Sequence, residues 1–447
     1  MKQPFILADD LTGAMDTGVQ LTGAGLSTGL IIRSEAQQAL LTAFDVLVLD
    51  TESRNISPDL AADAVRDQVD WAIKAGNNLI YKKIDSTLRG NIGYEIEATL
   101  TASGKTCALV APAMPGNGRT TRDGRHYVHG LPLLETEFAK DPFAPIFSSS
   151  IPEILAEGTD LPVSLLPVAV IRQGVAAVGS HLQRLIRQGI KIIVADAEVM
   201  SDLAVVSEAI KALSDLLPCG AADLLRQLIL NWTGLPDQPG RDRRAVTGGT
   251  ESINQQNLLP ENGSIIVLSG SPAQISKKQI AAVSTRPDTT VINIDPSRLI
   301  DGGRINQDAV GQTISNSRQA LAVGRHVVID ASGSSKDAVY SKAGGDAALM
   351  MRHGNLIRQA LGELAFSLIN QNRQNIGGLV IFGGDTSHSI LEKLETDVIQ
   401  ICGEVEPYIP EGRLIGGLCD GLRIVTKAGG FGNAATLDHI LTIGTVK

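Results

Sequence analysis

Aromatic residues are scarce in this chain, and their scarcity limits the ligands that it can hold. They make up 3% of the 447 residues, too few for the stacking platforms on which single-stranded nucleic acids usually bind. The formal net charge of −9 points the same way, because a phosphate backbone is normally met by a basic surface. We therefore expect no nucleic-acid partner.

Cysteines and histidines are also few, and neither has the spacing of a metal site. The four cysteines, Cys107, Cys219, Cys402 and Cys419, form no CxxC pair, and the seven histidines form no HExxH motif. We expect four buried free thiols in a reducing compartment and no zinc site.

Long apolar runs are missing as well. None approaches the roughly 20 residues that are needed to cross a bilayer. The first residues lead directly into a strand pattern, without the charged region, apolar stretch and cleavage site of a signal peptide. We expect a cytoplasmic protein with no membrane partner; a homodimer stays open.

Glycine, in contrast, is abundant. With 46 glycines and 43% hydrophobic residues, the chain is typical of a globular protein that is rich in turns. Its length exceeds what one ordinary core supports, which favours two or three domains. Near residues 234–263 the composition changes to Pro, Gly, Gln, Asn and paired charges. We predict a first domain over 1–235, a linker over 236–262 and a second domain over 263–447.

Both domains alternate short apolar runs with segments of helical period. The predicted strands are 5–9, 26–32, 45–50, 78–84, 106–111, 164–170 and 191–197, then 264–269, 290–295, 326–330, 379–383 and 422–427. The clearest helices are 57–75, 91–102 and 344–371. Residues 112–150 form a long predicted loop, and a loop of this length is usually functional or disordered. The pattern predicts an α/β fold of two doubly wound, mainly parallel-sheet lobes facing a cleft.

Two adjacent carboxylates, Asp9 and Asp10, follow the first apolar run. Bringing them together is unfavourable unless a cation, a substrate hydroxyl or a helix N-terminus meets them. They lie at the carboxyl end of a predicted strand, where open α/β sheets bind their ligands. The structural alternative is that Asp10 only caps the helix that begins at Leu11.

A second charged group stands at two other strand ends of the same domain. Lys82, Lys83, Asp85 and Arg89 lie close together, and Arg54 follows the strand that ends at residue 50. Along a strand Lys83 and Asp85 face one way and Lys82 the other. These cations suit a carboxylate ligand, with Asp85 orienting one of them; a solvated charge cluster is the alternative.

Glycine turns follow three strands of the second domain. Their candidate phosphate-binding residues are Ser269, Ser271, Gly383, Gly384, Asp385, Thr386, Gly429, Gly430 and Gly432. Glycines let backbone N–H groups and helix N-termini approach phosphates, here with Lys427 just upstream of the last turn. Asp385 could orient a metal ion's water or cap its helix.

Two other segments resemble phosphate-binding motifs. Gly104-Lys105-Thr106 lacks the earlier glycine of a P-loop and lies between a helix and a strand, so we predict a turn that closes a helix. Residues 430–435 fit the G-x-G-x-x-A pattern of a dinucleotide fold, although no second strand with a ribose-binding acid has room to follow. This partial match makes an NAD-dependent oxidoreductase the alternative function from a different enzyme class.

At these motifs the chain resembles the four-carbon acid sugar kinases, along nearly its whole length. The resemblance is carried by residues 8–14, 82–90 and 112–120 in the first domain, and by 383–386 and 427–432 in the second. It implies a first domain that binds the sugar acid and a second that binds ATP. Residues 123–138 look more like D-threonate kinases; 3-oxo-tetronate and D-erythronate kinases are the alternatives.

The resemblance implies phosphorylation of the terminal hydroxyl of a four-carbon sugar acid, with ATP and Mg²⁺ as cofactors. Asp9 is the first choice for orienting that hydroxyl, and Asp10 the second choice or a metal ligand. The substrate-binding residues would be Asp9, Arg54, Lys82, Lys83, Ile84, Asp85 and Arg89. The glycine turns of the second domain would hold the nucleotide.

Overall fold

The computed structural model describes residues 3–33, 41–141, 144–233, 263–271, 273–332 and 347–443. The chain divides into two compact units. The first unit is Met1–Thr28 with Phe44–Asp242, and the second is Gly29–Ala43 with Arg243–Lys447. The predicted linker, 236–262, lies outside the described residues.

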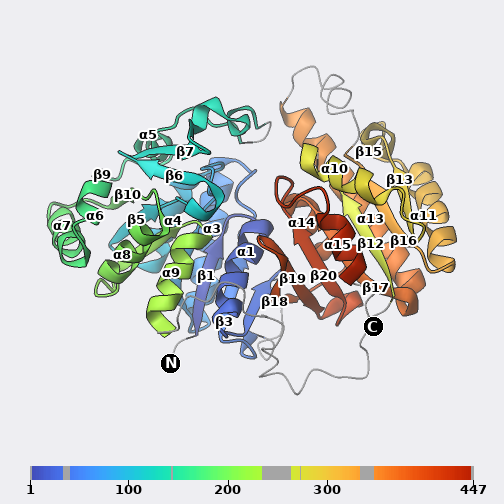
Figure 1. The fold of residues 1–447 in the computed structure, drawn as a ribbon, viewed down its shortest axis with the longest axis horizontal. Coiled ribbons are helices and arrows are strands. Elements are labelled where there is room, and N and C mark those ends of the chain that lie inside the picture. The colour runs from blue at the N-terminus through green and yellow to red at the C-terminus, as the bar shows by residue number, and fades with distance from the viewer. Residues whose placement is uncertain are drawn as a thin grey trace. The chain divides into compact units, whose positions relative to one another are not determined.

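The first unit is built on a parallel sheet (Figure 1). Its strand order is β3-β1-β4-β11-β5-β10-β9. The strands are β1 (Pro4–Ala8), β3 (Val46–Asp50), β4 (Asn78–Lys83), β5 (Cys107–Ala111), β9 (Val163–Leu166), β10 (Ile192–Ala195) and β11 (Leu216–Gly220). From β1 the chain proceeds to β3 on one side and later to β4 on the other. The carboxyl ends of these three strands therefore form a topological switch point.

Helices of the first unit pack in two groups. One contains α3 (Pro58–Lys74), α4 (Ile92–Ser103) and α5 (Ile151–Ala156); the other contains α1 (Leu11–Gly23), α6 (Val168–Ile171), α7 (Val175–Arg187), α8 (Met200–Ile210) and α9 (Ala222–Thr233). Ser57 is the N-cap residue of α3 and Pro58 is its first residue, although the Ser57 side chain makes no capping hydrogen bond. Gly104 closes α4 with a left-handed φ of 70°, which confirms a helix-ending turn instead of a P-loop.

The second unit has a mixed sheet, mainly parallel, in the order β13-β16-β12-β17-β20-β19-β18. Its strands are β12 (Ser264–Ser269), β13 (Thr289–Asn293), β16 (His326–Asp330), β17 (Ile376–Phe382), β18 (Val398–Glu406), β19 (Ile409–Ile415) and β20 (Arg423–Lys427). The strands β18 and β19 form an antiparallel hairpin, and β19 pairs antiparallel with β20. The order reverses between β12 and β17, so their carboxyl ends form this unit's switch point.

Helices of the second unit also form two groups. One contains α10 (Gln274–Val283) and α15 (Thr436–Ile443), and the other α11 (Gln307–Ala322), α13 (Ala347–Asn372) and α14 (Gly384–Lys393). A buried apolar cluster that includes Ile280, Phe382, Val425 and Leu441 joins the first group to the sheet. A short antiparallel pair, β14 (Ile300–Asp301) and β15 (Arg304–Ile305), adds to this unit.

The α/β class with mainly parallel sheets is confirmed, but some elements differ from prediction. The predicted strand 164–170 ends at Leu166, and Val168–Ile171 form the short helix α6 after Pro167. The predicted loop 112–150 contains a small antiparallel sheet of β6 (Arg119–Arg122), β7 (Arg125–Val128) and β8 (Leu131–Pro132). The strand β2 (Thr28–Ile31) lies beside β18, so its last three residues belong to the second unit despite their early position.

The four cysteines are free, as predicted, although Cys402 is only half-buried, unlike the other three. No helix among the described residues is long and apolar enough to cross a membrane.

Candidate functional site

Arg54 holds both N-terminal aspartates of the first unit. Its Nε and Nη2 donate to the two carboxylate oxygens of Asp9 at 2.8 and 2.9 Å. Its Nη1 and Nη2 donate to those of Asp10 at 2.5 and 2.7 Å. Asp10 also accepts from the amide of Gly13 at 2.7 Å as the N-cap of α1. Asp10 therefore caps its helix, as the structural alternative proposed, and shares a guanidinium with Asp9 as well.

The shared guanidinium acts differently on the two carboxyl groups. Burial raises the pKa of Asp9, but Arg54 and the ammonium groups of Lys82 and Lys83 outweigh this and hold it below its usual value. Burial also raises the pKa of Asp10, and there Arg54 does not compensate, because the Asp9 charge adds to the rise. Asp9 is thus the ionised member of the pair, and Asp10 accepts a proton more readily.

Lys82 and Lys83 point in opposite directions from β4, as the alternation of a strand predicts. The ammonium of Lys82 is fully buried and lies 2.7 Å from Glu95 on α4. Glu95 also accepts from the hydroxyl of Ser53 at 2.8 Å. The carboxylate that Lys82 meets is therefore internal to the protein. The sequence reading missed Glu95, although an acid on the buried face of a helix between Ile92 and Thr99 is a recognisable signal.

Lys83 points toward the aspartate pair. A Cβ atom at Gly13 would lie 3.0 Å from Lys83 Nζ, 2.7 Å from Asp10 Oδ1 and 3.7 Å from Asp9 Oδ1. Glycine at this position lets the three charged groups converge on the first turn of α1. Among the described residues, the Lys83 ammonium donates only to the carbonyl of Ile84, at 3.1 Å. It therefore retains donors for a ligand.

The turn after β4 is fixed by its own acid. Asp85 accepts from Arg89 Nε at 2.7 Å and from Thr87 Oγ1 at 2.6 Å. Burial raises the pKa of Asp85, but the charges of Arg89 and Arg54 hold it well below its usual value. Arg89 also pairs with Asp141 at 3.2 Å and lies over the ring of Phe138 at 5.5 Å. Asp85 thus orients a cation, as predicted.

Side chains from the small sheet brace the same turn. Arg119 donates to Ser86 Oγ, and its guanidinium lies 5.9 Å from the Phe138 ring. His126 is fully buried, with Nε2 2.8 Å from the Ser86 carbonyl and Nδ1 3.1 Å from Thr121 Oγ1. Burial lowers the pKa of His126 to about 4, so the ring is neutral near neutral pH. Local sequence patterns gave no signal for His126, because its partners are 5 and 40 residues away.

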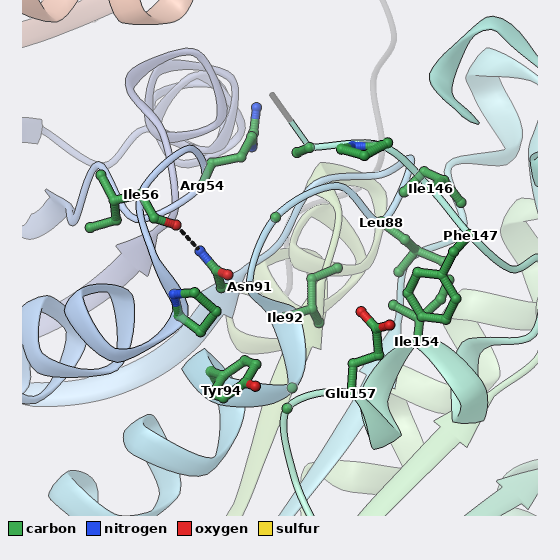
Figure 2. Close-up of a pocket in the computed structure, with 16 residues that line it drawn as sticks. Arg54, Ile56, Leu88, Asn91, Ile92, Tyr94, Ile146, Phe147, Ile154 and Glu157 are labelled. Carbon is green, nitrogen blue, oxygen red and sulfur yellow. Dashed lines mark hydrogen bonds between the residues drawn. The ribbon is translucent and has the colours of Figure 1, made fainter. Parts of the chain in front are cut away.

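A cavity of about 400 Å³ adjoins Arg54 in the first unit (Figure 2). Its lining includes the first residues of α3 and α4 and residues 144–147. Figure 2 shows Arg54 on one side, with Tyr94 and Glu157 across the cavity. The side-chain amide nitrogen Nδ2 of Asn91 donates to the carbonyls of Ser53 and Ile56 at 2.8 and 3.0 Å, which ties the Arg54 loop to α4. Arg54 is therefore shared by the cavity and the carboxylate pair.

In the second unit, the turns after β12 and β17 meet at the switch point. Ser269 aligns with Phe382 in the β12–β17 register. A Cβ atom at Gly270 would lie 2.6 Å from Thr386 Oγ1, so glycine allows the two turns to touch. Gly383 has a left-handed φ of 109° and is the N-cap residue of α14, which has no side-chain cap. The first amides of α14 are thus free of a capping side chain, as an anion site requires.

The third turn packs against the first. A side chain at Gly429 would overlap Ser271 Oγ, and Ser276 Oγ donates to the carbonyl of Gly429 at 3.0 Å. Ser269 Oγ is buried and has no hydrogen-bond partner among the described residues. Within that part of the chain, the amides of Gly429, Gly430 and Gly432 also have no partner. The three predicted glycine turns therefore lie together and offer unused donors.

Asp385 forms an ion pair and does not cap the helix α14. Its carboxylate lies 3.1 Å from Arg358 on α13, while the N-cap of α14 is Gly383. A metal ion at Asp385 would have to displace Arg358 or share the carboxylate with it.

Both units match families of known proteins. A family model described as a sugar-binding N-terminal domain matches residues 5–228, and one described as a nucleotide-binding C-terminal domain matches residues 266–437. A D-threonate kinase of Salmonella typhimurium (strain LT2) is 34% identical over 97% of this chain and 96% of its own length. A D-erythronate kinase of Heliobacterium modesticaldum is 29% identical over 99% of this chain and 98% of its own.

A solved structure supports the fold. The crystal structure of a protein from Salmonella typhimurium LT2, described as a putative tRNA synthase, superposes with a TM-score of 0.77. The superposition covers 98% of both chains at 22% sequence identity, a level that speaks for the architecture alone.

Proposed function

This chain belongs to the family of four-carbon acid sugar kinases, and we propose that it transfers the γ-phosphoryl group of ATP to the terminal hydroxyl of D-threonate. The observation that carries the proposal is the set of unused donors in both units. Lys83 retains donors beside an ionised aspartate, and three glycine amides have no partner in the described part of the nucleotide-binding unit. The similarity to a D-threonate kinase supports the choice of substrate.

The sugar acid binds in the first unit through its carboxylate and its hydroxyl groups. Arg54 and Lys83 meet the substrate carboxylate, since a guanidinium and an ammonium are its natural partners. Because Arg54 already donates to Asp9 and Asp10, binding exchanges one of those contacts for the substrate. Asp10, whose pKa is raised, is the carboxyl group that gives up its cation most easily. Asp85 keeps Arg89 in place, and Glu95 keeps Lys82 in place.

Asp9 orients the attacking hydroxyl. Its carboxylate is ionised and accepts a hydrogen bond from the hydroxyl before reaction. As the oxygen bonds to the γ-phosphorus, the bond to the β-phosphate oxygen breaks, ADP leaves, and Asp9 takes up the hydroxyl proton. Because such transition states are loose, positioning contributes more than proton removal.

ATP binds to the glycine turns of the second unit through backbone donors. The amides of Gly429, Gly430 and Gly432, the start of α14 at Gly384 and the buried hydroxyl of Ser269 supply neutral donors. A bound Mg²⁺ would supply positive charge that offsets the charge of the phosphates. Asp385 is the candidate carboxylate ligand, by exchange with Arg358.

A coupled assay of ADP release tests the proposal. D-threonate, D-erythronate and 3-oxo-tetronate are each offered with ATP and magnesium, and omission of the sugar acid is the control. We expect turnover with D-threonate to be the fastest. Faster turnover with D-erythronate or 3-oxo-tetronate would reassign the substrate. No turnover with any four-carbon acid would refute the proposed activity. Binding of NAD without ATP would favour the oxidoreductase alternative.

A further inference from the structure

Lys427 points into the protein, toward the backbone carbonyls of the last glycine turn. It is the last residue of β20 and is fully buried. Its Nζ donates to the carbonyls of Ala428, Gly429 and Phe431 at 3.0, 3.1 and 3.2 Å, and to Ser276 Oγ at 3.2 Å. The ammonium also lies 4.4 Å from the centre of the Phe382 ring. No carboxylate of the described residues pairs with it.

The three carbonyls that Lys427 holds belong to the same peptide units as the three unpartnered amides. In a trans peptide, the C=O of one residue points opposite to the N–H of the next. The carbonyls of residues 428, 429 and 431 turn toward the ammonium, so the N–H groups of Gly429, Gly430 and Gly432 turn away from it. Each of these donors is a glycine amide, where no side chain shields the approach of a phosphate.

Two residues of α10 complete the arrangement. Ser276 accepts from Lys427 and donates to the Gly429 carbonyl at 3.0 Å. Gln279 donates through Nε2 to the carbonyls of Phe431 and Asn433 at 3.2 and 2.8 Å. The loop carbonyls are thus gathered on the α10 side, and the unused amides are on the other.

We propose that Lys427 is a positioning residue that turns the peptides of residues 428–432 so that their amides face the nucleotide phosphates. The proposal rests on the proposed function, because it assigns the ligand of those amides to ATP. Lys427 does not touch the phosphate itself. Its positive charge polarises the three peptides that it holds, which strengthens their N–H groups as donors to an anion.

The arrangement has a consequence for pH. Burial lowers the pKa of Lys427 to about 7, and no charged group contributes to this shift. Above that pH the neutral amine has two N–H donors for four oxygen atoms, so the loop loosens and nucleotide affinity falls. The stability of the second unit changes in the opposite direction. Between pH 7 and the ordinary value of 10.5, the unfolded chain binds more protons than the folded one, so this group makes folding more favourable as pH rises.

The test replaces Lys427 with an apolar side chain of similar length. ADP binding and D-threonate binding are measured by calorimetry between pH 6 and 9 for the wild type, Lys427→Met and Lys393→Met. Lys393 is an exposed lysine of the same unit, at the end of α14, and serves as the matched control. Thermal unfolding of each variant reports on the fold.

We expect Lys427→Met to weaken ADP binding about 10- to 100-fold near pH 6.5, since several hydrogen bonds that shape the donors are lost. The wild type should lose ADP affinity as pH rises through 7, and Lys427→Met should lack this dependence. D-threonate binding should be unchanged in both variants, and Lys393→Met should bind ADP like the wild type.

Equal ADP affinity in Lys427→Met and the wild type would overturn the inference. A fall in D-threonate affinity as large as the fall in ADP affinity would overturn it too, because it would indicate a general structural role. If the wild type binds no nucleotide, the proposed function fails first. Should Lys427→Met not fold, Ser276→Ala removes one oxygen of the same arrangement; a loss of a few fold in ADP affinity alone is then expected, and unchanged affinity would refute the proposal.

Discussion

In the first unit the charged side chains at the strand ends, Lys83 excepted, are paired with one another, whereas in the second unit several polar groups at the strand ends have no partner in the described chain. Arg54 donates four hydrogen bonds to Asp9 and Asp10. Three glycine amides and the Ser269 hydroxyl of the second unit, by contrast, meet no hydrogen-bond partner among the residues that the structure describes. Arg54 must exchange internal partners to bind a ligand, whereas the glycine turns already present their donors.

This contrast follows from the chemistry of the two proposed ligands. A sugar acid is small, so its carboxylate must be met by full charges, and buried charges without a ligand must satisfy each other. A triphosphate is long and brings its own metal ion, so neutral amides at glycine turns can hold it without a cost when it is absent. Amides exposed to water are not left unsatisfied.

The largest effect should come from breaking the paired site. Arg54→Met leaves two buried carboxylates without their cation, and removal of one partner from a buried ion pair costs about 3–5 kcal/mol. We expect a drop of that size in the free energy of unfolding of the first unit, together with loss of D-threonate turnover. Chemical denaturation measures it. Lys74→Met removes a cation from an exposed pair of the same unit and should change stability by less than about 1 kcal/mol. Equal costs for both variants would contradict the internal pairing.

The next effect concerns the chemistry within the pair. Asp9→Asn keeps the size of the side chain but removes its charge, and general-base assistance typically contributes ~10²–10⁴-fold. We expect the lower end of that range in turnover, because the transition state is loose. Asp10→Asn retains a helix cap and should lose less, since Asn caps about as well as Asp. Steady-state kinetics on both variants decides between the two residues. A larger loss of turnover in Asp10→Asn would assign the orientation of the hydroxyl to Asp10.

The smallest effect probes the preformed site. A Cβ atom at Gly430 would meet nothing in the protein within 4 Å, so Gly430→Ala should fold normally. If a phosphate approaches that amide, the added methyl should weaken ADP binding about tenfold, the loss expected for one hydrogen bond to a charged group. Gly311→Ala on α11 also meets nothing within 4 Å and is the matched control. Equal ADP affinities in calorimetry would place the phosphates elsewhere.

Strand ends and glycine turns were accessible from the sequence because each is a local pattern. Asp9, Asp85 and Gly430 follow apolar runs, and parallel sheets gather such positions at one edge. The partners that hold these residues were not accessible. Glu95 meets Lys82 across 13 residues, and Ser276 meets Lys427 across 151, distances over which no periodicity applies.

The second unit also contains elements that local patterns could not place. Residues 29–43 group with it from a position far upstream, and the hairpin of β18 and β19 adds antiparallel strands to a mainly parallel sheet. The inward turn of Lys427 is a further case. The sequence suggested a lysine near the phosphates, whereas the structure directs its charge to the loop carbonyls.

The division of labour between the units is tested most directly by crossed calorimetry on two folded variants. Gly430→Ala and Asp9→Asn are each titrated with ADP and with D-threonate. The division predicts that Gly430→Ala loses affinity for ADP alone, and that Asp9→Asn alters binding of D-threonate alone. If Gly430→Ala instead lost D-threonate affinity while its ADP affinity was intact, the assignment of sugar acid and nucleotide to the two units would be contradicted.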